Sequence, residues 1–183
     1  MARAPTRAET AAHARGLRLL VVAALATFLL DQATKWLVVH RLGLRDRGAI
    51  DVLPPWVNLR MAWNEGVNFG LAASLDMRWV LVAVAVAISA LVVVWVRRDR
   101  AGPRAHLAAG LLVGGALGNV VDRVLYGAVA DFLNLSCCGL ENPYAFNVAD
   151  IAVFLGALGL VLFAGTGGGR VARGRGDAGR KAR

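Results

Sequence analysis

The chain has 183 residues, of which 57% are hydrophobic, and its mean hydropathy is +0.55. A soluble domain of this length has fewer apolar residues and interrupts its apolar segments, so this composition excludes an ordinary soluble globular protein. The net charge of +9 would suit nucleic-acid binding, but the basic residues are confined to tails and alternate loops, as in membrane proteins.

Four apolar segments approach or exceed the length of about 20 residues that a helix needs to cross a bilayer. They are roughly 17–39, 79–96, 106–125 and 145–165. We expect one four-helix membrane domain over 17–165, between disordered basic tails at 1–16 and 166–183. The start resembles a secretory signal peptide, but the first apolar segment continues without a small-residue cleavage site, so we interpret it as a retained helix.

Lys and Arg are concentrated before residue 19, in the loop 97–104 and after residue 165. The loop 126–146 has neither, and the five Arg of the loop 40–78 are offset by four acids. This distribution predicts that both termini and the loop 97–104 are cytoplasmic, and that the other two loops face outward.

Near its outward end, the first segment carries Asp31 and Lys35. Their spacing of four places both side chains on one face of a helix. They form either a structural ion pair or a site in which the lysine faces a substrate. The sequence leaves both interpretations open.

The outward loop after the first segment contains a predicted strand. Pro54 and the proline after it interrupt any helix, and residues 57–64 alternate between apolar and polar. We expect a small amphipathic sheet within 45–75 on the outer membrane surface, with Trp56 and Trp63 at the lipid interface. The fold class is therefore an all-α membrane protein with a small β element between its first two helices.

The third segment carries Gly110, Gly114 and Gly118 at a spacing of four, which allows another helix backbone to approach closely. Its outward end places three polar residues within one turn: Asn119, Asp122 and Arg123.

Two acids lie where a membrane protein holds charge at high cost, which makes them candidates for a functional site. Asp131 follows the third segment, with Asn134 near it in sequence, and Asp150 opens the fourth, with Asn147 near it. Both belong to outward ends joined by a short connection, so we expect them to meet. Two neighbouring carboxylates share one proton and titrate as a unit, and such a pair activates water for peptide hydrolysis without a cofactor.

Other chemistries fit less well. The three His are scattered, so no metal site is predicted, and the serines have no glycine-flanked turn. Cys137 and Cys138 are adjacent in an outward loop, and we assign them no role. The residues alone still allow a small non-catalytic transporter or assembly factor, and a scaffold whose polar residues only hold helices together.

Five motifs in order resemble the bacterial lipoprotein signal peptidases, also called signal peptidase II, and the resemblance covers roughly 17–165. The motifs are Asp31-Gln32-Ala33-Thr34-Lys35, Asn64-Glu65-Gly66-Val67-Asn68-Phe69-Gly70, Gly118-Asn119-Val120-Val121-Asp122-Arg123, Gly127-Ala128-Val129-Ala130-Asp131-Phe132 and Phe146-Asn147-Val148-Ala149-Asp150. One departure is Asn68, where many members of that family have alanine.

The resemblance implies an aspartic endopeptidase of the bacterial cytoplasmic membrane, with its active site at the outer face. It implies that the enzyme acts on diacylglyceryl-modified prolipoproteins and cuts just before the lipid-modified cysteine. Asp131 and Asp150 would be catalytic. Residues that would support them or bind substrate are Asn119, Arg123, Asn147, Asn64, Asp31, Lys35, Gly66 and Asp122.

The same resemblance places a sheet cradle and a short outer helix within 45–75. It implies a monomer surrounded by membrane lipids and inhibited by cyclic peptides such as globomycin. No metal, cofactor or nucleic acid is expected.

Overall fold

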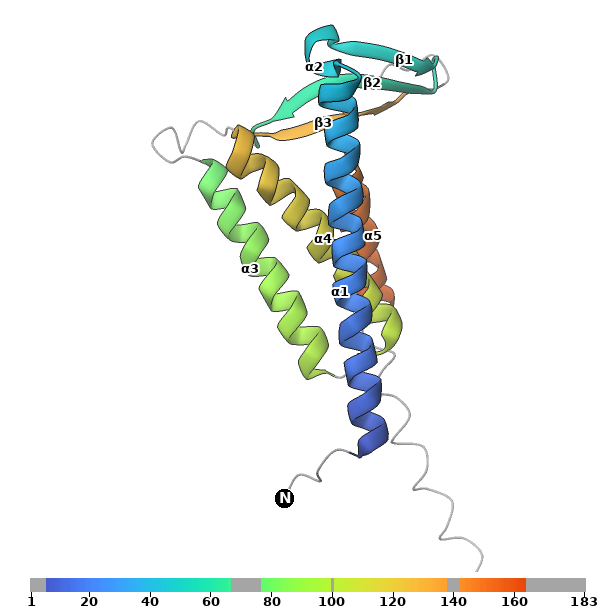
Figure 1. The fold of residues 1–183 in the computed structure, drawn as a ribbon, viewed down its shortest axis with the longest axis vertical. Helices are drawn as coiled ribbons and strands as arrows, with labels where there is room; N and C mark the ends of the chain where they lie inside the picture. Colours follow the sequence, from blue (N-terminus) through green and yellow to red (C-terminus); the bar gives the residue numbers. More distant parts are fainter. Residues whose placement is uncertain (1–5, 67–76, 100, 138–141, 164–183) are drawn as a thin grey trace, which may run out of the picture.

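The structure is a computed structural model that describes residues 6–66, 77–99, 101–137 and 142–163. Four long helices stand side by side, and a small sheet lies across one end of them (Figure 1). In chain order the elements are α1 (Arg7–Lys35), the π-helix η1 (Trp36–Arg41), α2 (Leu44–Arg47), β1 (Ala49–Leu53), β2 (Val57–Asn64), α3 (Met77–Arg98), α4 (Pro103–Tyr126), β3 (Val129–Leu135) and α5 (Val148–Phe163).

Within the described residues, three helices are long and apolar enough to cross a membrane, namely the continuous helix Thr10–Arg41, α3 and α4. The fourth predicted span coincides with α5, an apolar helix of 16 residues. At 1.5 Å per residue these 16 described residues extend over about 24 Å of the roughly 30 Å of a bilayer's hydrocarbon core.

The first helix begins earlier than the hydropathy pattern predicts. α1 starts at Arg7, so residues 7–16 are helical and do not belong to a disordered tail. This stretch contains four Ala, two Arg and one Glu, which favour helix, but it is not apolar enough to extend a predicted membrane span.

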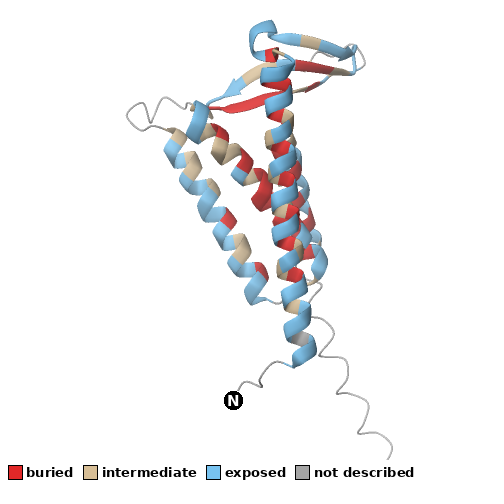
Figure 2. Cartoon of the chain, in the orientation of Figure 1, coloured by how far each residue is buried: buried red, intermediate tan, exposed pale blue. Residues whose placement is uncertain are grey.

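α4 is the central helix, and its buried residues face the helices around it (Figure 2). A Cβ added to Gly110 would lie 2.5 Å from the backbone oxygen of Leu20 in α1. From α5, a Cβ on Gly156 would lie 2.5 Å from the backbone nitrogen of Leu112 in α4. The close approach that the glycine spacing predicts is therefore confirmed.

A Gly110→Val variant is expected to push α1 away from α4 and to destabilise the protein by at least about 1–3 kcal/mol, because the rigid backbone of Leu20 cannot yield. The midpoint of thermal unfolding in detergent measures this loss. Gly102→Ala is the matched control, since a Cβ at Gly102 meets nothing within 4 Å. Equal midpoints for the two variants would contradict the close packing.

The sheet is antiparallel in the order β1-β2-β3. The predicted strand over 57–64 is confirmed as β2. β3 was not predicted: it comes from the chain after α4 and pairs with β2, so that Asp131 lies opposite Ala62. A buried apolar cluster packs the sheet on the end of the first helix, and it consists of Val38, Leu44, Leu59 and Phe132.

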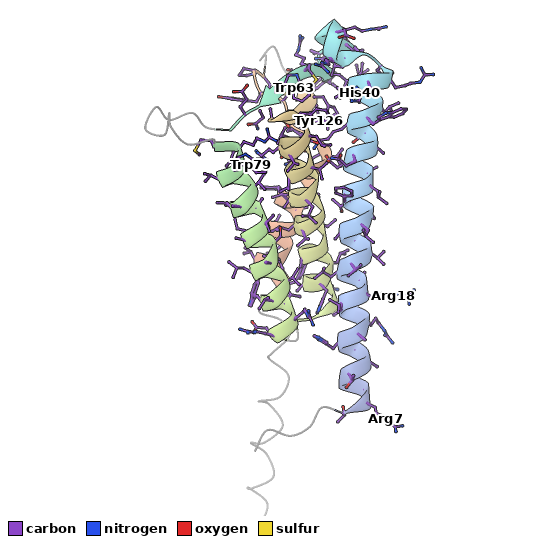
Figure 3. All side chains as sticks on the ribbon, turned by 60° about the vertical axis from the view of Figure 1, so that its left-hand side comes forward. Arg7, Arg18, His40, Trp63, Trp79 and Tyr126 are labelled. Atoms are coloured by element: carbon purple, nitrogen blue, oxygen red, sulfur yellow. The ribbon has the colours of Figure 1, made fainter. Side chains whose placement is uncertain are left out.

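Large aromatic side chains occupy the sheet end of the molecule. Trp63, Trp79 and Tyr126 are exposed there, whereas Arg7 and Arg18 lie toward the opposite end of α1 (Figure 3). Aromatic residues of this kind are typical of the boundary between lipid and water.

Candidate active site

The two acids meet because β3 holds the segment that leads into α5. Leu133 in β3 donates its N–H to the Phe146 carbonyl at 2.8 Å, and Phe146 donates back to the Leu133 carbonyl at 3.0 Å. Asp131 lies two residues before this pair, and Asp150 lies in the first turn of α5, four residues after it. The strand pairing thus brings Asp131 and Asp150 to the same end of the bundle.

Asn147 contacts both acids and is fully buried. Its amide nitrogen Nδ2 donates to Asp131 Oδ1 at 2.6 Å. Its Oδ1 accepts the backbone N–H of Asp150 at 2.9 Å, and its own backbone N–H donates to Asp150 Oδ2 at 3.2 Å. This reciprocal pair is a helix-capping arrangement, here made by Asn and Asp. The carboxylates of Asp131 and Asp150 are therefore held on either side of a single residue.

Two further amides complete the hydrogen bonds of the acids. Asn64 at the end of β2 donates to Asp131 Oδ2 at 3.1 Å, and Asn119 on α4 donates to Asp150 Oδ1 at 2.9 Å. Asn64 is itself oriented by the backbone N–H of Gly66, which donates to Asn64 Oδ1 at 3.0 Å. Each of the four carboxylate oxygens thus accepts a hydrogen bond.

The electrostatic environment favours a proton on Asp131. Burial raises the pKa of Asp131 to about 6, and repulsion from Asp150 adds to this effect. The hydrogen bonds from Asn64 and Asn147 act in the opposite direction. Arg123 on α4 interacts electrostatically with both acids, and its Nη1 donates to the Asn119 carbonyl at 3.4 Å.

Beneath the acids lies a buried ion cluster of Asp31, Lys35 and Asp122, which we call the Lys35 cluster. The Lys35 ammonium is 2.9 Å from Asp31 Oδ2 and 2.7 Å from Asp122 Oδ2. It also donates to Asn119 Oδ1 at 3.1 Å. An ammonium has three N–H groups, so all of them are engaged. Of the two interpretations left open by the sequence, this arrangement favours the structural ion pair.

The Lys35 cluster also holds the backbone next to each acid. Asp122 Oδ2 accepts the N–H of Ala130 at 3.2 Å, and Asp31 Oδ1 accepts the N–H of Ala149 at 3.0 Å. Ala130 directly precedes Asp131, and Ala149 directly precedes Asp150. One lysine therefore connects the two chain segments that carry the acids.

Sequence reasoning missed three contributors to this network. Gln32 donates to Asp122 Oδ1 at 3.2 Å and to the Gly118 carbonyl at 3.3 Å. Its place in the Asp31–Lys35 motif was the available signal. The two backbone N–H groups, of Ala130 and Ala149, had no side-chain signal at all.

Asn134, which is near Asp131 in sequence, takes no part in the hydrogen bonds of that acid. Its amide donates to the carbonyls of Asn142 and Tyr144, at 2.7 and 2.8 Å, and so fixes the loop between β3 and α5. The reason is the alternation of a strand, since residues three apart point to opposite faces. Cys137 is exposed, whereas Asn68 and Cys138 lie outside the described residues.

A cavity with an empty volume of about 620 Å³ lies on the other face of β3. Lys35 and Asp122 line it together with the aromatic residues Trp36, Trp63 and Tyr126. Neither Asp131 nor Asp150 lines this cavity. Over the described ranges of the chain, no three His, Cys, Asp or Glu side chains are grouped to hold a metal ion.

Comparison with known proteins identifies relatives that match most of the chain. The lipoprotein signal peptidase of Sphingopyxis alaskensis is 42% identical over 147 residues, which is 79% of this chain and 84% of that protein. The lipoprotein signal peptidase of Methylobacterium sp. (strain 4-46) is 44% identical over 151 residues, which is 81% of this chain and 89% of that protein.

A solved structure of a bacterial membrane enzyme, obtained by the in meso method at 1.9 Å, has a TM-score of 0.68 and 26% identity. The match covers 78% of this chain and 90% of that one. The family model described as Signal peptidase (SPase) II matches residues 23–165, a segment that contains all five sequence motifs and both acids. The chain therefore belongs to the signal peptidase II family.

Proposed function

We propose that this chain is an aspartic endopeptidase that removes the signal peptide from prolipoproteins, with Asp131 and Asp150 as its catalytic pair. The observation that supports this most directly is the shared contact of both carboxylates with Asn147. Two acids that both contact one residue and are surrounded by neutral amides repel each other when both are charged. Such a pair retains one proton between them. Family membership supports a peptidase and argues against the transporter that the residues alone allowed.

The environments of the two acids suggest different roles. Asp131 is buried and its pKa is raised, so it is the neutral member that donates a hydrogen bond to the scissile carbonyl oxygen. Asp150 is half-buried, and its carboxylate accepts the backbone N–H of Asn147; we assign it the role of the base that takes a proton from water. The hydroxyl oxygen bonds to the carbonyl carbon while Asp131 protonates the carbonyl oxygen. Collapse of this tetrahedral intermediate re-forms the C=O bond and breaks the C–N bond. A hydroxyl proton of the intermediate returns to Asp131, and the proton on Asp150 passes to the departing amine.

The position of the acids suits a substrate that is itself embedded in lipid. They lie at the sheet end of the bundle, among exposed Trp residues, which we propose to be the outer membrane surface. In this topology α5 is the fourth span. Both termini are then cytoplasmic, as the basic tails predict. A diacylglyceryl-modified precursor would keep its acyl chains and signal helix in the bacterial inner membrane and present the bond before its lipid-modified cysteine to the acids.

The decisive experiment is to incubate the purified protein with a diacylglyceryl-modified prolipoprotein and, separately, with its unmodified precursor. We expect release of the signal peptide from the modified substrate alone, with the modified cysteine as the new N-terminus. Inhibition by globomycin and activity of the monomer follow from the same proposal. Equal cleavage of both precursors would contradict lipid-dependent recognition, and no cleavage of either would contradict the proposed activity.

An Asn64→Ala variant is expected to change the pH dependence of processing. Loss of the proton from Asp131 gives kcat/KM a descending limb above about pH 6 in the unmodified enzyme. The Asn64 hydrogen bond stabilises the charged form of Asp131, so its removal raises the pKa further and moves this limb to higher pH. Val52→Ala, an exposed and uncharged change in the same sheet, should leave the limb in place. A limb that moves to lower pH in Asn64→Ala would refute the assignment.

A further inference from the structure

A second polar site lies at the end of the bundle opposite the acids. There an open groove with a volume of about 370 Å³ separates α1 from the end of α3. Its lining consists of His13 from α1 and of Val94, Arg97 and Arg98 from α3. Sites for small ligands commonly have volumes of about 300–1,000 Å³, so the groove is large enough for a head group.

The charge around this groove is strongly positive. Arg97 and Arg98 are exposed at the last turn of α3. Between Asp76 and Asp122 the sequence contains one acid, Asp99, which follows the two arginines directly. Arg104, at the start of α4, adds a further positive charge, and its guanidinium lies 5.6 Å from the Phe163 ring at the end of α5.

The side of the groove formed by α1 is supported by contacts with α4. The ring of His13 contacts the ring of His106 edge-on, with centroids 6.3 Å apart. His106 is buried in α4, its Nδ1 lies 3.1 Å from the Gly102 carbonyl, and its ring packs closely on Gly16 of α1. Its Nε2 has no hydrogen-bond partner among the described residues. His13 therefore lies against a buried polar ring and lines the same groove as the two arginines.

We propose that this groove binds the phosphate group of an anionic phospholipid. The order of the lining residues along α3 matches the order of groups in such a lipid along the membrane normal. The charged residues Arg97 and Arg98 lie at the end of the helix, and the apolar Val94 lies one helical turn further into the bundle. A phosphate would contact the two guanidinium groups, and the glycerol and upper acyl carbons would contact Val94. Basic pockets between transmembrane helices bind anionic head groups in this way. A water-soluble phosphate would gain nothing from the apolar part of the lining.

The test is the affinity of the purified full-length protein for phosphatidylglycerol, measured in mixed micelles against a phosphatidylcholine background. Two exposed arginines are removed together in Arg97→Gln/Arg98→Gln, which is expected to weaken binding at least about tenfold. The matched control is Arg45→Gln/Arg47→Gln, which removes two exposed arginines of α2 at the other end of the molecule. The control is expected to bind as the unmodified protein does.

Three results would overturn the proposal. Equal weakening in both double variants would mean that the protein responds only to its overall charge. Equal affinity for phosphatidylglycerol and phosphatidylcholine would mean that the head group is not recognised. Competition by millimolar inorganic phosphate or glycerol phosphate, with the same loss in Arg97→Gln/Arg98→Gln, would mean that the groove holds a soluble anion and not a lipid.

Discussion

An Asp150→Asn variant is expected to insert into the membrane and to process prolipoprotein at least about 10²–10⁴-fold more slowly than the unmodified protein. The amide fills the same volume but cannot take a proton from water. The Asn147 oxygen still accepts the backbone N–H at residue 150, and the new amide oxygen still accepts one N–H. The new NH₂ group faces the other donor, so one hydrogen bond is lost. The loss is therefore one of chemistry, and the folded protein remains.

Asp131→Asn is expected to be similarly inactive for a different reason. The amide that replaces the Asp131 carboxyl group cannot protonate the carbonyl oxygen. In addition, one of the two oxygens that accept hydrogen bonds from Asn64 and Asn147 is replaced by an NH₂ group, which faces one of those donors. The double variant should be no slower than either single one, because the two acids act as a unit and their effects are not additive.

Release of signal peptide in a single-turnover assay measures these losses, and detergent-extracted yield and thermal unfolding show that the variants are folded. Asp46→Asn is a suitable control, since Asp46 is an acid on α2 that is exposed and has no contact with the site. Activity close to that of the unmodified protein in Asp131→Asn or Asp150→Asn would disprove the catalytic pair.

Much of this site follows from the sequence, because two kinds of periodicity are strong here. The apolar segments locate the helices, and the alternation over residues 57–64 locates β2. The costly position of two acids identifies Asp131 and Asp150, and helical spacing identifies the Asp31–Lys35 ion pair.

β3 could not be predicted in the same way, because the residues from Val129 to Phe132 are all buried and show no alternation. Its pairing with β2 joins parts of the chain that are distant in sequence, and nothing local indicates it. The same reason hides the N–H groups of Ala130 and Ala149, since an alanine carries no polar side chain to suggest a contact. Hydropathy does not predict the early start of α1, because residues 7–16 have a high helix propensity but are too polar to be included in an apolar segment.

The backbone contacts of Ala130 and Ala149 indicate the role of the Lys35 cluster. If the Lys35 ammonium only neutralised Asp31, its bonds to Asp122 and to Asn119 would be unnecessary. Through Asp122 it holds the backbone before Asp131, and through Asp31 the backbone before Asp150. We infer that Lys35 is a positioning residue that sets the separation of the two acids, and that it does not contact the substrate.

A Lys35→Arg variant tests this inference without leaving a buried acid unpaired, which would cost about 3–5 kcal/mol and endanger folding. The positive charge stays, but a planar guanidinium cannot direct its N–H groups to three acceptors that converge on one ammonium. We expect kcat to fall by about 10²-fold, because small misplacements of reacting groups are costly, while KM changes little. The pH profile should shift as well, since Lys35 lies close enough to Asp131 to influence its proton. Arg41→Lys, an exposed exchange of the same two residue types on η1, should change none of these quantities. A Lys35→Arg enzyme with normal kcat and a raised KM would instead make the lysine a substrate contact.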